Sequence, residues 1–122
     1  MASWRYSSTE KGIPMTRREK LETMLADEPQ DQLLRYMLAM EWDKEGDHDR
    51  SLSLLVTLMS DPSPYVPAFL MAGQQYTRLN RVGAARAVFQ QGIAAAQQQG
   101  DMHAFEELKR FLSELGVDES GA

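Results

Sequence analysis

The chain has 122 residues, 43% hydrophobic and 25% charged, which suits one globular domain that folds around its own core. It has no cysteine, so disulfides and thiolate metal sites are excluded, and its net charge of -5 argues against binding to nucleic acid. The sequence shows neither a long apolar run nor a signal peptide, so we expect no membrane association and a cytoplasmic protein.

Residues 1–15 mix Ser, Thr, Gly and Pro with the isolated aromatics Trp4 and Tyr6, and they are predicted to form a flexible tail. The pattern Thr16-Arg17-Arg18-Glu19 then has the form of a capping box, which predicts the start of a first helix. That helix is expected to end before Pro29. Residues 117–122 are predicted to form a second flexible tail.

Apolar residues at helical spacing continue along the chain, separated by Gly-Asp and Pro-containing breakers. Alternation with a period of two is absent, and valine and isoleucine are few. The fold class is therefore predicted to be all-α. The further helices are expected at about 31–43, 52–59, 67–79, 84–98 and 102–115.

The sequence matches itself at one offset, which is 34 residues long and pairs Trp42 with Tyr76. At these positions a small residue, an aromatic residue or an apolar residue recurs. The paired positions are Leu38 and Ala72, Ala39 and Gly73, Trp42 and Tyr76, Ser51 and Ala85, and Leu55 and Phe89. Glycine inside a helix costs about 1 kcal/mol relative to alanine. Gly73 and Gly92 therefore predict a close approach between helices.

This pattern resembles the tetratricopeptide repeat family, whose signature is an aromatic, Leu-Gly, Tyr, Ala, Phe and a closing Pro. The better copy reads Phe69, Ala72, Gly73, Tyr76, Ala85, Phe89. The poorer copy has Arg35 in place of the aromatic, and the better copy lacks the closing proline. The resemblance covers about residues 17–98 and implies antiparallel helix-turn-helix pairs in a short right-handed superhelix. The predicted domain is 16–116, with a partial repeat 16–28, repeats 30–62 and 64–98, and a capping helix 101–116.

The resemblance implies a protein that binds a peptide or helix of an unidentified partner in a concave groove and acts as an adaptor or scaffold. Because Arg35, Leu38 and Trp42 are expected to pack on the paired helix, the neighbouring stripe is expected to face this groove. The predicted groove residues are Leu33, Tyr36, Met37, Met40, Lys44, Leu70, Met71, Gln74 and Arg78. Tyr36 and Met40 favour a binding role. Leu33, Leu70 and Met71 fit equally well as packing residues.

Two alternatives stay open. In the first, the same apolar surface forms a homodimer. In the second, the segment Trp4-Arg5-Tyr6 occupies the groove of its own chain or is itself the segment that a partner protein binds. No catalytic or phosphate-binding motif occurs, so we expect no enzyme activity and no cofactor. His48 lies in a Gly-Asp-His-Asp turn, and that pattern is more typical of a helix cap than of a metal site.

Overall fold

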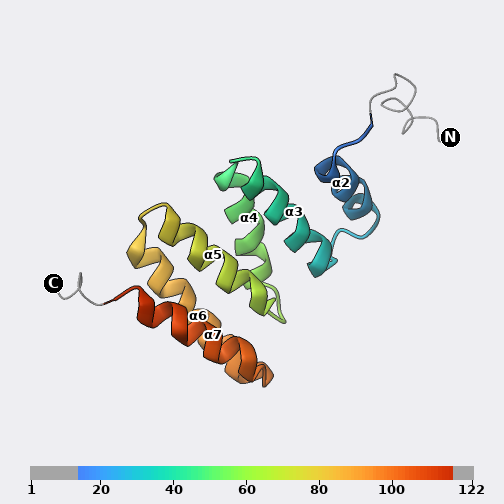
Figure 1. The fold of residues 1–122 in the computed structure, drawn as a ribbon. Coiled ribbons are helices and arrows are strands. Elements are labelled where there is room, and N and C mark those ends of the chain that lie inside the picture. Colours follow the sequence, from blue (N-terminus) through green and yellow to red (C-terminus); the bar gives the residue numbers. More distant parts are fainter. Residues whose placement is uncertain (1–13, 117–122) are drawn as a thin grey trace. The chain divides into compact units, whose positions relative to one another are not determined.

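The computed structural model describes residues 14–116, which form six α-helices and no strand (Figure 1). The helices are α2 (Arg17–Asp27), α3 (Gln32–Lys44), α4 (His48–Met59), α5 (Val66–Arg78), α6 (Val82–Gln99) and α7 (Met102–Glu114). The all-α prediction is confirmed. The tails predicted at the two ends fall almost wholly outside the described residues. Within 14–116, no helix has the length and apolar character needed to cross a bilayer.

The chain divides into two compact units, Met1–Ser51 and Leu52–Ala122, with the boundary inside α4. The first unit contains α2, α3 and the first turn of α4. The second contains the rest of α4 together with α5, α6 and α7. The single domain expected from the sequence over 16–116 stays a prediction.

In the first unit, α2 and α3 form a helix-turn-helix pair. The predicted capping box begins α2: the Glu19 N–H donates to the Thr16 hydroxyl over 3.0 Å, and the Thr16 N–H donates to the Glu19 carboxylate over 2.9 Å. Leu21 is the buried residue of α2. On α3, Arg35 is also buried, and its guanidinium donates to the Gln30 carbonyl over 3.2 Å. That bond ties α3 to the turn from which it starts.

Three helix junctions share one backbone geometry. The helix ends in a residue with positive φ, and the next backbone N–H donates to a carbonyl five residues back. The positive-φ residues are Gly46 (85°), Asn80 (62°) and Gly100 (73°), and the bonds join Asp47 to Trp42, Arg81 to Tyr76 and Asp101 to Ala96 over 2.8–2.9 Å. Trp42 and Tyr76 therefore occupy equivalent junctions one 34-residue period apart.

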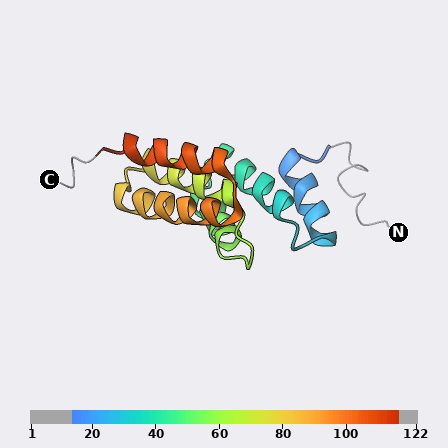
Figure 2. The ribbon, with the colours of Figure 1, turned by 90° about the horizontal axis from the view of Figure 1, so that it is seen from below.

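In the second unit, α5, α6 and α7 lie side by side in both views (Figures 1 and 2). The predicted close approach of α5 and α6 is observed at both glycines. A methyl group at Gly73 would overlap the ring of Phe89, and one at Gly92 would lie 2.6 Å from Cβ of Phe69. The core of this unit includes Leu55, Leu58, Ala68, Phe69, Ala72, Ala85, Phe89, Ala96 and Leu108.

Candidate functional site

A cavity of about 430 Å³ opens between α5, α6 and α7 in the second unit. Two aromatic rings line it, Phe89 of α6 and Phe111 of α7, with centroids 6.0 Å apart and planes 24° from parallel. Phe89 is 1% exposed, whereas Phe111 is half-buried. The lining residues are Gln74, Thr77, Arg78, Phe89, Phe111, Glu114 and Leu115.

Helical spacing explains how α5 and α7 line the cavity. Residues three and four positions apart lie on one face of a helix, and the two helices use the same spacing. On α5 these are Gln74, Thr77 and Arg78; on α7 they are Phe111 and Glu114, and Leu115 follows at the C-cap. The Thr77 hydroxyl donates to the Gly73 carbonyl over 2.8 Å, which holds that side chain against its own helix.

Charged groups surround the aromatic centre of the cavity. Arg110 lies over the Phe111 ring, 4.6 Å from its centroid, and donates to the Glu114 carboxylate over 3.3 Å. Arg110 also lies 4.0 Å from the Glu107 carboxylate. The charged residues of the lining itself are Arg78 and Glu114. The cavity can receive an apolar group with polar atoms at its edge.

Three of the four residues predicted on α5 line a cavity. Gln74 and Arg78 line the 430 Å³ cavity, whereas Leu70 lines a smaller one of about 180 Å³ between α5 and α7, together with Pro67 and His103. Met71 is half-buried. Two residues of the predicted groove thus lie at the larger cavity.

The residues predicted on α3 belong to the first unit. Tyr36, Met37 and Met40 are half-buried, and Leu33 is 54% exposed. Lys44 is exposed, with its Nζ 3.4 Å from the Glu41 carboxylate. Since the α3 and α5 residues lie in different units, a groove that combines them stays a prediction.

The sequence did not indicate Phe111, Glu114 or Leu115 as site residues. Beyond Gln98 the repeat fails, and α7 is expected from the sequence to act as a cap with a polar outer face. Phe111 falls outside the apolar stripe predicted for that helix, which is Met102, Phe105, Leu108, Leu112 and Leu115. Its presence beside that stripe was the available signal that α7 has a wider apolar face than a simple cap requires.

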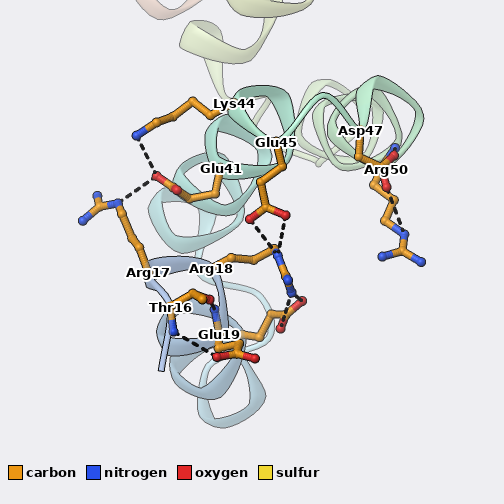
Figure 3. A network of polar contacts seen from close by, with 10 residues as sticks. Thr16, Arg17, Arg18, Glu19, Glu41, Lys44, Glu45, Asp47 and Arg50 are labelled. Carbon is orange, nitrogen blue, oxygen red and sulfur yellow. Dashed lines mark hydrogen bonds and ion pairs between the residues drawn. The ribbon is translucent and has the colours of Figure 1, made fainter. Parts of the chain in front are cut away.

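Polar contacts join α2 to α3 in the first unit (Figure 3). Glu41 of α3 accepts from Arg17 over 2.8 Å, and Glu45 accepts from Arg18 over 2.9 Å. The hydrogen bond that Arg18 donates to Glu45 raises the pKa of the Arg18 guanidinium above its ordinary value. Arg18 also lies 4.4 Å from the centroid of the Trp42 ring. Ion pairs therefore contribute to the contact between these two helices, beside the buried Leu21.

We expect the attachment of α2 to weaken with salt. Raising the ionic strength shortens the Debye length from about 10 Å at 0.1 M to about 3 Å at 1 M, and this screens ion pairs that reach solvent. Amide hydrogens of α2 should then exchange about two- to five-fold faster, a change typical of exposed pairs. Amides of α5 and α6, which pack on each other through apolar residues, serve as the internal control. Equal acceleration in all three helices would contradict an electrostatic attachment.

His48 is the first residue of α4, at the turn that follows α3. His48 Nδ1 lies 3.1 Å from an Asp43 carboxylate oxygen, and the Asp47 carboxylate accepts from the Arg50 N–H over 3.0 Å. The second bond is the helix cap expected at this turn. Within 14–116, no three His, Asp or Glu side chains are grouped so that they could hold a metal ion.

Comparison with known proteins places this fold among described repeat proteins. No protein-family model matches the sequence. A TPR repeat-containing protein of Pseudomonas aeruginosa is 30% identical over 97 residues, which cover 80% of this chain and 92% of that protein.

Two solved structures are also similar. The solution structure of a tetratricopeptide repeat domain protein from Salinibacter ruber is 33% identical with a TM-score of 0.67, covering 71% of this chain and 88% of that one. The solution structure of a protein from Bordetella parapertussis is 31% identical with a TM-score of 0.69, covering 84% and 89%. The equivalent junctions at Trp42 and Tyr76 agree with these likenesses, and the chain belongs to the tetratricopeptide repeat family.

Proposed function

We propose that the chain is a non-catalytic protein–protein interaction module, an adaptor or scaffold that binds a segment of a partner protein. Proteins of this repeat family are generally interaction modules. The observation that carries the proposal is the open, aromatic-lined cavity between α5, α6 and α7, with Gln74 and Arg78 on its wall. Cavities of roughly 300–1,000 Å³ lined by apolar groups and a few polar ones are typical of binding sites.

A second contact surface on α3 is part of the proposal. It consists of Leu33, Tyr36, Met37, Met40 and Lys44. Tyr36 and Met40 support it because a half-buried tyrosine offers an apolar ring with a polar tip, and methionine adapts to irregular partners. Changing both to serine tests this surface separately from the cavity on α5, and the remaining cooperativity of unfolding shows whether they are packing residues instead.

A displayed library of random peptides, selected on the full chain, tests the cavity. Thr77 is exposed at its wall, so Thr77→Trp should fill the space without disturbing the core. The matched control is Gln91→Trp, which places the same side chain on an exposed position of α6. Selected peptides should bind the first variant at least about ten-fold more weakly, since loss of one anchor pocket is worth about 1.4 kcal/mol or more. They should bind the control as they bind the parent chain. Equal binding to both variants, or no selected peptide, would reject this site.

Self-association is a second candidate function, and exposed apolar side chains in the first unit favour it. Met24 is 51% and Leu33 54% exposed. A homodimer through the apolar α3 surface would need a contiguous apolar patch, the kind of surface that marks contacts between proteins. Sedimentation equilibrium distinguishes the two functions. If the chain forms a dimer, the molar mass should fall to that of a monomer in the variant Leu33→Asp. A monomeric mass of the parent chain over the whole concentration range would reject self-association.

A further inference from the structure

We propose that the two cavities between α5 and α7 form one groove, which binds an extended segment of the partner protein through two apolar side chains four residues apart. The larger of these side chains occupies the 430 Å³ cavity, and a smaller aliphatic one occupies the 180 Å³ cavity. This inference rests on the proposed function and specifies the conformation and the spacing of the bound segment.

Both cavities lie along the same pair of helices. The smaller cavity is lined by residues in the first half of α5 and of α7, and the larger one by residues in the second half of both. The two helices therefore run in the same direction, and they lie side by side (Figure 2). A segment that follows them passes both cavities in turn.

The two cavities differ in size and in lining. The larger one has the rings of Phe89 and Phe111 on its wall, and a ring of the partner can stack on such a pair at about 4.5–7 Å. The smaller one has room for a shorter side chain. Most of its lining is aliphatic: Val66, Pro67, Leu70, Ala104 and Leu108.

Helix geometry gives the distance between the two cavities. On both helices the residues of the larger cavity follow those of the smaller one by about nine positions on average, which at a rise of 1.5 Å per residue is about 13 Å. An extended chain advances about 3.3 Å per residue, and its side chains alternate between two sides. Residues four apart in such a chain therefore lie on one side, about 13 Å from each other.

A partner helix matches this distance poorly. Residues seven and eleven apart share one face of a helix, but they are about 10.5 Å and 16.5 Å from each other along the axis. Residues eight apart are separated by about 12 Å, but they point about 80° away from each other. The spacing of the cavities therefore favours the extended segment.

Gln74 gives a second reason for an extended segment. It follows Leu70 and precedes Arg78 at intervals of four residues on α5, so its side-chain amide lies between residues that line the two cavities. An amide can pair with the backbone N–H and C=O groups of an extended chain, whereas a helix uses these groups internally.

This chain does not itself carry the required pair of side chains. Residues 1–13 include Trp4 and Tyr6, but no two large apolar residues of that segment are four positions apart. Residues 117–122 have one large apolar residue, Val117. The non-helical stretches of residues 14–116 have no such pair either. The proposed occupant is therefore a segment of a different protein.

Uncharged peptides with blocked ends test the spacing. In N-acetyl-Trp-Ser-Ser-Ser-Leu-amide the two anchors are four residues apart, and peptides with one serine fewer or one more place them three or five apart. Each peptide is also made with the anchors exchanged, because an extended segment can lie along the groove in either direction. All are titrated at millimolar concentration into the isotopically labelled full chain. Amides of Thr77 and Phe111 report the larger cavity, and those of Leu70 and Ala104 the smaller one.

In one of the two directions, the peptide with three serines should bind at least about five-fold more tightly than those with two or four, a difference of about 1 kcal/mol. It should shift the amides at both cavities with a single midpoint. Equal affinity for all spacings, or shifts at one cavity alone, overturns the inference. A peptide of residues 1–13 should bind at least about five-fold more weakly, and equal binding would make that segment the occupant in place of another protein.

A substitution in the smaller cavity tests its part in binding. Ala104 is half-buried on the wall, and Ala104→Leu fills the space while the backbone N–H of residue 104 keeps its bond to Asp101. The variant should weaken the peptide with three serines at least about five-fold. It should not affect the same peptide with serine in place of leucine. The matched control, Ala94→Leu, lies at an exposed position of α6 and should change neither affinity. Equal effects of the two variants would reject the second anchor.

Gln74→Met tests the contact with the backbone of the bound segment. It removes the amide from a side chain of similar length, and it should weaken the peptide with three serines at least about two-fold, as expected for one hydrogen bond. Unchanged binding would reject this contact.

The outcomes separate this inference from the proposed function. Selected library peptides that lose affinity for Thr77→Trp but not for Ala104→Leu would preserve the interaction module and reject the inference. Library selection with no peptide at either cavity would reject both.

Discussion

Replacing Gly92 with alanine is expected to lower the free energy of unfolding by about 2 kcal/mol, although alanine is the better helix former by about 1 kcal/mol. The added methyl group would lie 2.6 Å from Cβ of Phe69 and 3.2 Å from Cδ1 of Leu108. Cβ of Phe69 is attached directly to the α5 backbone, so no side-chain rotation can move it away. The helices must separate instead, and close-packed interiors resist such movement.

The control for this substitution lies in the same helix. Gly83 is exposed in the first turn of α6, and a methyl group there would meet no atom within 4 Å. Gly83→Ala should therefore raise the free energy of unfolding by about 0.4–1 kcal/mol, because it restricts only the unfolded chain. Urea or thermal unfolding of the two variants gives changes of opposite sign. A stabilising Gly92→Ala would mean that α5 and α6 do not approach as closely as described.

Local signals in the sequence account for the layout of the helices. The Gly-Asp breakers at Gly46 and Gly100 were expected to separate helices, and both glycines have the positive φ that allows such a stop. The box at Thr16 and the caps at Asp47 and Asp101 also follow from residue type alone. Boundaries shifted by a few residues, as at α6, which begins at Val82 instead of Ala84. Capping and φ preferences are local, so one sequence suffices to predict them.

The cavity could not be predicted in the same way. Periodicity shows which face of a helix is apolar, but it does not show which neighbour that face meets. Phe111 meets Phe89 because α7 packs on both α5 and α6, and no repeat alignment extends beyond Gln98 to indicate this. The cation–carboxylate pairs between α2 and α3 depend on the same kind of tertiary information.

The two repeats suggest why residue 73 is glycine. In the preceding repeat the sequence has Ala39 and Leu55 at the positions that correspond to Gly73 and Phe89. The larger side chain, Phe89, thus occurs together with the smaller residue, Gly73. If this is compensation, Gly73→Ala and Phe89→Leu should each lower the free energy of unfolding by about 1–2 kcal/mol, the first by overlap and the second by a cavity.

The free energy of unfolding of the double variant should then fall by much less than the sum of the two single decreases. A leucine at 89 leaves room for the methyl group at 73, so the two substitutions share one contact, and a coupling of about 1 kcal/mol or more is expected. Denaturant unfolding of all four chains measures it. Additive losses of stability would mean that the size of the side chain at 89 does not explain why residue 73 is glycine. Favourable coupling would mean that the ring lies on the α5 backbone because residue 73 has no side chain, and the same contact then fixes both the stability of the α5–α6 pair and the shape of the cavity above it.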